Sequence, residues 1–233
     1  MQQIAPNIYT FSGLTVGRAY LIKDEDGLTL IDASISRSAP KIIAQIQALG
    51  HSIQDLKRIF ITHAHPDHVG GLKAVQAASG AEVYATNEEK QVIEGEKTIP
   101  SPERAVLHGI HKFLVPPPTR ISASPVHHII NDGETYPVGG GLQVIATPGH
   151  AQGHVAFYLP AHKLIFGGDV LMALFNRLTF PLPSATVDMA TNRQSLTKFL
   201  ALDLQIIALG HGAPITENAQ QRLHDWAKTK GVG

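Results

Sequence analysis

Apolar residues recur along the chain in short runs bounded by glycine, proline or polar residues. Runs rich in β-branched and aromatic residues predict strands at 7–11, 16–22, 28–33, 58–62, 82–85, 127–130, 141–146, 154–159, 163–168 and 205–210. Apolar positions at helical spacing predict helices at 38–49, from 69 onward, and at 87–94, 103–114, 188–201 and 216–229, the last with Thr216 as its N-cap. The pattern therefore predicts a mixed α/β fold.

The two halves of the chain repeat one arrangement. In each half several strands precede a helix, and a short apolar strand then ends in a histidine loop, "IFITHAH" at 59–65 and "IIALGHG" at 206–212. This layout predicts two α/β halves packed face to face, with a site on loops at one sheet edge. No linker-like composition separates the halves, so we expect a single domain over residues 1–233.

Residues 96–125 differ from the rest of the chain in their proline content. Six prolines fall there, at positions 100, 102, 116, 117, 118 and 125. Proline disfavours regular structure, so much of this segment is expected to be extended or turning. Two interpretations stay open: a connector that runs over the surface, or a flap that shapes a pocket.

Composition narrows the class of function. The formal net charge is zero and the isoelectric point is about 7.3, which gives no electrostatic basis for binding nucleic acid or an acidic membrane surface. The first residues do not resemble a signal peptide, and no apolar run approaches the length of a membrane span, so we expect a cytoplasmic protein. The chain has no cysteine, so any metal must bind through nitrogen and oxygen.

Ligand-type side chains gather at four turns, each of which follows an apolar run. The turns read "THAHPDHVGG" (62–71), "TPGHAQGH" (147–154), "FGGD" (166–169) and "LGHG" (209–212). In the first turn, His63 and His65 are two residues apart and point to the same side of an extended segment. Asp67 and His68 are adjacent and can point to different places. Two neighbouring metal ions need such an arrangement.

These turns resemble the motifs of the metallo-β-lactamase superfamily, from about residue 7 to 215. The family's His-x-His-x-Asp-His motif and its later ligands are matched by His63, His65, Asp67, His68, His150, Asp169 and His211. Asp32 matches the family's early strand aspartate. The resemblance implies a four-layer αββα sandwich with a dinuclear metal site. It further implies that His63, His65 and His150 hold one ion, that Asp67, His68 and His211 hold the other, and that Asp169 bridges both.

The resemblance also implies two zinc ions per chain, although iron and manganese accept the same ligands. Two divalent ions lower the pKa of a shared water, and the resulting hydroxide would attack a carbonyl of a small-molecule substrate. Asp67 is expected to orient this hydroxide and to move its proton. Asp32 and His154 are expected to orient ligands through hydrogen bonds.

The expected reaction is hydrolysis of a small carboxylic thioester, ester or lactone, as in the hydroxyacylglutathione hydrolase (glyoxalase II)-like and lactonase-like branches. Hydrolysis of a β-lactam is an alternative, but many β-lactamases lack the bridging aspartate that Asp169 matches. Full-length hydroxyacylglutathione hydrolases have a C-terminal helical region that grips glutathione, whereas only the last 22 residues of this chain follow His211.

Two further hypotheses belong to other classes. A mononuclear iron oxygenase acting on glutathione persulfide would use His63, His150 and Asp169. "LMALFNRLTF" (171–180) stands where that branch has Gly-Arg-Thr-Asp-Phe, which disfavours it. A non-catalytic binding module is disfavoured by the complete ligand set. The sequence leaves the substrate and the oligomeric state open.

Overall fold

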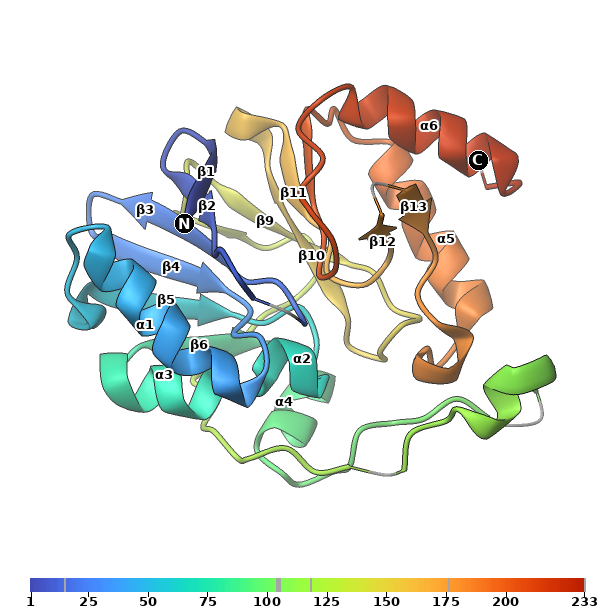
Figure 1. The fold of residues 1–233 in the computed structure, drawn as a ribbon, viewed down its shortest axis with the longest axis horizontal. Coiled ribbons are helices and arrows are strands. Elements are labelled where there is room, and N and C mark those ends of the chain that lie inside the picture. The colour runs from blue at the N-terminus through green and yellow to red at the C-terminus, as the bar shows by residue number, and fades with distance from the viewer. Residues whose placement is uncertain (15, 104–105, 118, 176, 233) are drawn as a thin grey trace.

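Two β-sheets face each other in the computed structural model, which describes residues 1–233 except 15, 104–105, 118, 176 and 233 (Figure 1). The first sheet has seven strands in sequence order: β1 (Gln2–Ala5), β2 (Ile8–Thr10), β3 (Tyr20–Asp24), β4 (Gly27–Ile31), β5 (Leu56–Phe60), β6 (Glu82–Ala85) and β7 (His128–Ile129). The second sheet runs in the order β14 (Ile206–Ala208), β11 (Leu164–Phe166), β10 (Val155–Leu159), β9 (Leu142–Ala146) and β8 (Thr135–Tyr136). A separate hairpin pairs β12 (Met172–Leu174) with β13 (Arg177–Thr179).

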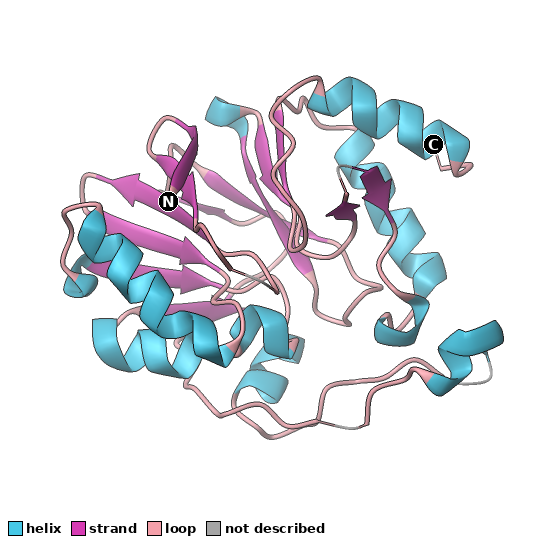
Figure 2. Cartoon of the chain, in the orientation of Figure 1, coloured by secondary structure: helices cyan, strands magenta, loops and turns pink. Residues whose placement is uncertain are grey.

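Helices cover the outer faces of both sheets (Figure 2). The helices are α1 (Ala39–Ala48), α2 (Pro66–Val69), α3 (Leu72–Ser79), α4 (Asn87–Ile93), α5 (Met189–Leu200) and α6 (Ala219–Thr229). One apolar cluster joins α1 and α3 to the first sheet, a second fills the space between the sheets, and a third joins the second sheet to α5 and α6. The expected four-layer αββα arrangement is therefore confirmed.

Strand alternation explains how each sheet serves two clusters. In β3, the side chains of Tyr20 and Ile22 lie between the sheets, whereas Leu21 packs in the cluster under α1 and α3. In β10, Phe157 lies between the sheets while Ala156 and Tyr158 face α5 and α6. Both faces of these strands are buried, which accounts for their nearly continuous apolar sequence.

The parallel strands determine where the loops meet. β4, β5 and β6 pair in parallel, as do β11 and β14. Their carboxyl ends therefore lie at one edge of each sheet, and the chain leaves them through the turns singled out in the sequence. Asp32 follows β4, the His63 turn follows β5, Asp169 follows β11 and His211 follows β14.

Several predicted boundaries are wrong for local reasons. The expected strand at 16–22 begins only at Tyr20, because Ser34 Oγ donates hydrogen bonds to the carbonyls of Val16 and Gly17 and holds that stretch as a loop. The strands β1, β8, β12 and β13 were not predicted, since they have only two to four residues and carry little periodic signal.

Three helix predictions also need correction. The helix expected from residue 69 begins only at Leu72, as α3, because the short helix α2 ends at Val69 and Gly70 and Gly71 separate the two. Helix α6 follows Asn218 and not Thr216, because Ile215 is still paired with Ile207 in a β-bridge. Within 103–114, where residues 104–105 lie outside the described part, the described residues show 3-10 geometry at Val106 and a 3-10 helix at Gly109–Phe113, and they form no α-helix.

The proline-rich segment 96–125, here called the strap, leaves the end of α4, reaches the side of the molecule that carries α5, and returns to β7 (Figure 1). The Ile99 N–H bonds to the Thr119 carbonyl at 3.0 Å, which ties its two arms together. Among the described helices, none has the length and apolar character required to cross a bilayer.

Candidate metal centre

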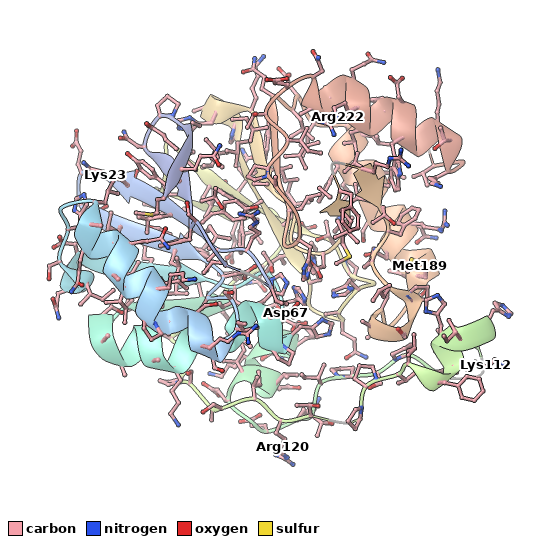
Figure 3. All side chains as sticks on the ribbon, in the orientation of Figure 1. Lys23, Asp67, Lys112, Arg120, Met189 and Arg222 are labelled. Atoms are coloured by element: carbon pink, nitrogen blue, oxygen red, sulfur yellow. The ribbon has the colours of Figure 1, made fainter. Side chains whose placement is uncertain are left out.

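The seven ligand-type residues of the four turns lie together at the edge where the two sheets meet. They form three overlapping groups, each with its ligand atoms within 4.8 Å of one another: His63, His65 and His150; His63, His68 and Asp169; and Asp67, His68 and His211. In Figure 3, Asp67 lies between the half that carries the first sheet and the half that carries the second. Folding therefore brings together side chains separated by up to 148 positions, as the topology of the sheet edges requires.

Asp169 occupies the position between the groups. Its Oδ2 lies 3.5 Å from His150 Nε2 and 3.2 Å from His211 Nε2, and its Oδ1 lies 3.4 Å from His68 Nε2. His150 Nε2 is in turn 3.0 Å from His65 Nδ1, and His211 Nε2 is 3.1 Å from Asp67 Oδ2. One carboxylate thus contacts members of both outer groups.

The residues present fit a metal ion. His63 Nε2, His68 Nε2 and Asp169 Oδ1 are buried and have no hydrogen-bond partner in the described structure. Buried polar atoms are normally satisfied, and leaving one unpaired costs about 1–3 kcal/mol. Metal ions bound among these atoms would satisfy all three, and imidazole nitrogen with carboxylate oxygen suits zinc.

Asp32 orients two of the ligand histidines. Its Oδ1 accepts the Thr62 N–H at 2.9 Å, and its Oδ2 accepts the Thr62 hydroxyl at 2.8 Å and contacts His68 Nδ1 at 2.7 Å. Because the Thr62 hydroxyl donates to Asp32, its oxygen accepts from His63 Nδ1, 3.1 Å away. The lone pair of His63 Nε2 is therefore free to face the centre. Asp32 holds this place with a left-handed φ of 57°, a strained conformation for a non-glycine residue.

His154 lies beside the centre but is not placed to bind a metal. Its Nε2 accepts the Asp169 N–H at 3.0 Å, so its Nδ1 carries the proton and donates to Thr147 Oγ1 at 2.8 Å. Both ring nitrogens are engaged. The ring thus holds the backbone of Asp169 through this hydrogen bond.

The ligand histidines fall into two sets, one with lowered and one with raised pKa values. Burial lowers the pKa of His63 and His150 and brings that of His65 to about 4, so these rings are neutral, which is the form that binds a metal. Burial opposes a charge on His211, but hydrogen bonds to Asp169 and Asp67 outweigh it and raise the pKa of His211 to about 9.

The charged half of the set also contains His68. Its burial is outweighed by the Asp169 and Asp32 carboxylates, which raise the pKa of His68 well above its usual range. The pKa values of Asp67 and Asp169 are lowered, because the histidines outweigh burial of the carboxylates. Ligation by His68 and His211 requires loss of their ring protons, so metal binding here releases protons.

Gly210 allows the last loop to pass against the centre. A Cβ at this position would lie 2.1 Å from Asp169 Oδ1 and 2.5 Å from His68 Cε1. The Tyr20 hydroxyl donates to the Leu209 carbonyl at 2.6 Å and anchors the same loop to the first sheet. The "LGHG" turn therefore needs glycine before its histidine.

Sequence reasoning missed Glu89 on α4. Its side chain is 4% exposed and accepts the Ala64 N–H at 2.7 Å and the Gly153 N–H at 2.8 Å. Burial raises the pKa of Glu89 to about 7, although both hydrogen bonds favour the carboxylate. Nothing in "NEEKQVI" distinguishes this glutamate from Glu88 beside it.

Two cavities lie along the strap, and the inner one reaches the centre. The inner cavity, about 200 Å³, is lined by His65 and Asp67 together with Ile99 and the Pro100–Pro102 stretch of the strap. The outer cavity, about 810 Å³, shares that stretch and continues past Val106 to Met189 at the start of α5. Among the described residues no lysine or arginine lines either cavity. Figure 3 shows Lys112 and Arg120 at the outer margin of the strap, away from Asp67.

Similar proteins include hydroxyacylglutathione hydrolases and a probable metallo-hydrolase. The hydroxyacylglutathione hydrolase GloC of Haemophilus influenzae is 28% identical over 210 residues, which cover 89% of this chain and 90% of that protein. The hydroxyacylglutathione hydrolase of Brucella anthropi is 32% identical over 204 residues, or 87% of this chain and 64% of that protein. The probable metallo-hydrolase YflN of Bacillus subtilis is 29% identical over 224 residues, with coverage of 88% and 84%.

Solved structures of metallo-β-lactamase family proteins have a similar fold. A metallo-β-lactamase family protein of Thermus thermophilus, TTHA1429, superposes with a TM-score of 0.71 at 25% identity over 98% of this chain and 81% of that chain. BJP-1, a subclass B3 metallo-β-lactamase of Bradyrhizobium japonicum, shares the fold with a TM-score of 0.72 at 24% identity, over 97% and 89%.

The family model described as the metallo-β-lactamase superfamily matches residues 12–211, which span most of the chain and hold all seven ligand-type residues. This confirms the resemblance found in the sequence. The chain is a metallo-hydrolase that belongs to the metallo-β-lactamase superfamily.

Proposed function

We propose that this chain, as a single domain, is a dinuclear zinc hydrolase that cleaves a small carboxylic thioester, ester or lactone. The observation that carries the proposal is the position of Asp169, whose Oδ2 lies 3.5 Å from His150 Nε2 and 3.2 Å from His211 Nε2. A bridging carboxylate of this kind serves two ions. His63, His65 and His150 would hold one zinc, and Asp67, His68 and His211 the other. Iron or manganese would accept the same atoms.

The bound ions would supply Lewis acidity and a water of lowered pKa. The chain's own residues do the rest. Asp67 lines the inner cavity and holds its carboxylate toward the centre, so it can accept and pass on the proton of the attacking water. The strap brings Ile99 and Pro100 against the same cavity, which excludes bulk water from the acyl group.

The comparison proteins support thioester hydrolysis. GloC carries the name hydroxyacylglutathione hydrolase, and the alignment covers 90% of its length. A relative of similar extent thus bears this name, so the short segment after His211 is no argument against a thioester substrate. The cavity walls favour an apolar substrate portion, since Ile99, Val106 and several prolines form much of their described lining. The name of the relative thus bears on the bond that is cleaved, and the cavity walls bear on the substrate groups beside that bond.

The test uses purified protein loaded with zinc. Hydrolysis of S-lactoylglutathione is compared with that of an acyl-homoserine lactone and of a neutral thioester with the same lactoyl group. A kcat/KM of about 10⁴ M⁻¹s⁻¹ or more on any of them is expected of an enzyme with its own substrate class. Metal analysis should give two zinc ions per chain. One ion at saturation would overturn the dinuclear assignment, and two ions without turnover of any of the three would overturn the substrate class.

A further inference from the structure

We propose that Glu89 is a positioning residue of the metal centre, which sets the distance between the loop of His63 and His65 and the loop of His150. This inference rests on the proposed metal centre. Glu89 belongs to α4, contacts no ligand atom, and lies outside the four turns that carry the ligands.

Each carboxylate oxygen of Glu89 holds a different loop. Its Oε2 accepts the N–H of Ala64, the residue between His63 and His65 in the turn after β5. Its Oε1 accepts the N–H of Gly153, in the turn between β9 and β10 that carries His150. These turns extend from different sheets. A single buried side chain therefore joins the two halves of the group formed by His63, His65 and His150.

Helix α4 also grips Gly153 from its other side. The Thr86 hydroxyl, at the start of this helix, donates to the Gly153 carbonyl at 2.8 Å. A Cβ on Gly153 would lie 2.4 Å from Thr86 Oγ1 and 2.8 Å from the Glu88 Cβ, so the loop packs directly on the helix. The position of Gly153 is thus fixed through both its N–H and its carbonyl.

The chemistry of the contact requires a carboxylate. Both partners of Glu89 are N–H donors, and the site is too deeply buried for water to replace a lost bond freely. Glutamine has one acceptor oxygen and one NH₂ group, so one backbone N–H would face another donor. The substitution Glu89→Gln should therefore release one loop while keeping the size of the side chain.

The expected effect is asymmetric between the two ions. Ala64 lies between two members of the His63–His65–His150 group and Gly153 lies in the turn of the third, whereas His68 of the other group is bonded directly to Asp32. If Glu89 served only general stability, its substitution would weaken the binding of both ions equally. If it positions the ligand loops, its substitution would weaken the binding of one ion.

The experiment titrates cobalt into wild type, Glu89→Gln and the control Glu94→Gln, and follows the visible absorption bands of each ion. Glu94 is the C-cap residue of α4 and, like Glu89, accepts a backbone N–H, that of Val126 at 2.9 Å, but this bond lies away from the ligand loops. Affinity is measured by chelator competition, and stability by thermal unfolding. For Glu89→Gln we expect one ion to bind about 10- to 100-fold more weakly, with altered bands, as is typical of outer hydrogen-bond partners. Glu94→Gln should match wild type in both ions.

Wild-type spectra and affinities in Glu89→Gln would overturn the inference, and so would an equal loss at both ions. If Glu89→Gln does not fold, Thr86→Val removes only the bond to the Gly153 carbonyl and should weaken the same ion by a smaller factor; no change there would also overturn it. A wild-type protein that binds one ion contradicts the dinuclear proposal instead. The effect of Glu89→Gln on that single ion would still decide the role of Glu89.

Discussion

The metal centre and the strap differ in how firmly the surrounding structure holds their side chains. At the centre, His63 and His68 are fully buried and Asp169 is 3% exposed, and Asp32 and His154 hold them through hydrogen bonds. On the strap, Val106 is 63% exposed and Phe113 is 86% exposed. The metal centre is held by buried hydrogen bonds, whereas the strap presents exposed apolar side chains.

The difference suggests a division of roles. A network of buried hydrogen bonds allows few alternatives, so a change there should act on metal binding and on every substrate. A wall of prolines and aliphatic side chains recognises size and apolarity, so a change in the strap should act on some substrates and leave the metal content alone. Substitutions in each region can test this division.

The largest effect is expected for Asp169→Ala. The substitution removes the carboxylate shared between His150 and His211, so at least one ion per chain should be lost. Hydrolysis should fall by more than about 100-fold, beyond the usual effect of an outer hydrogen-bond partner. Metal analysis and kcat/KM on the best substrate measure both. Undiminished metal content and rate would refute the bridging assignment.

Asp32→Asn should have the next largest effect. An amide has a single acceptor oxygen, so it cannot serve both the Thr62 N–H and the contact with His68 Nδ1. Metal affinity should fall by about 10- to 100-fold, as measured by chelator competition. Asp26→Asn is the control, because Asp26 pairs with Arg58 near the surface and this substitution should leave metal affinity unchanged. Equal affinities in the two variants would show that Asp32 does not orient the ligands.

His154→Ala should keep both ions. Its ring nitrogens bond to the Asp169 N–H and to Thr147, so the loss frees the Asp169 backbone without removing a ligand. We expect affinity to fall by about tenfold or less, at the low end of the range for outer partners. Two ions per chain at saturating zinc would agree with this role. Loss of one ion would mean that His154 is itself a ligand.

The clustering of the seven ligand-type residues could be predicted from the sequence because each sits in a short motif after an apolar strand, and the carboxyl ends of β5 in one sheet and of β11 and β14 in the other meet where the two sheets adjoin. The strand pattern predicted two α/β halves face to face, and the family resemblance supplied the four-layer αββα order. Glu89 could not be predicted, since its partners are backbone N–H groups 25 and 64 positions away that carry no sequence signal.

The strap was equally hard to read from sequence. Prolines indicated that its residues are extended or turning, but proline content does not say what a segment packs against. Local spacing favoured a helix over 103–114, but the described residues of this range have 3-10 geometry, at Val106 and at Gly109–Phe113, in place of an α-helix. Apolar residues at helical spacing over about a dozen positions do not stabilise a helix unless its apolar face packs against another element. The position of the strap beside the inner cavity depends on contacts between distant parts of the chain.

The smallest effect is expected in the strap, from Val106→Asp. Val106 lines the outer cavity and is largely exposed, so the charge should leave folding and metal content intact while making the wall less apolar. An ester or thioester with an apolar chain long enough to reach this wall should lose about fivefold in kcat/KM, which corresponds to roughly 1 kcal/mol of lost apolar contact. An acetyl substrate that stays in the inner cavity should lose nothing. Phe113→Asp places the same charge on the same segment at a residue that does not line the cavity, so it should leave both substrates unaffected. A uniform loss across chain lengths, or an equal loss in Phe113→Asp, would mean that the strap acts on the centre itself, and the division between the two regions would fail.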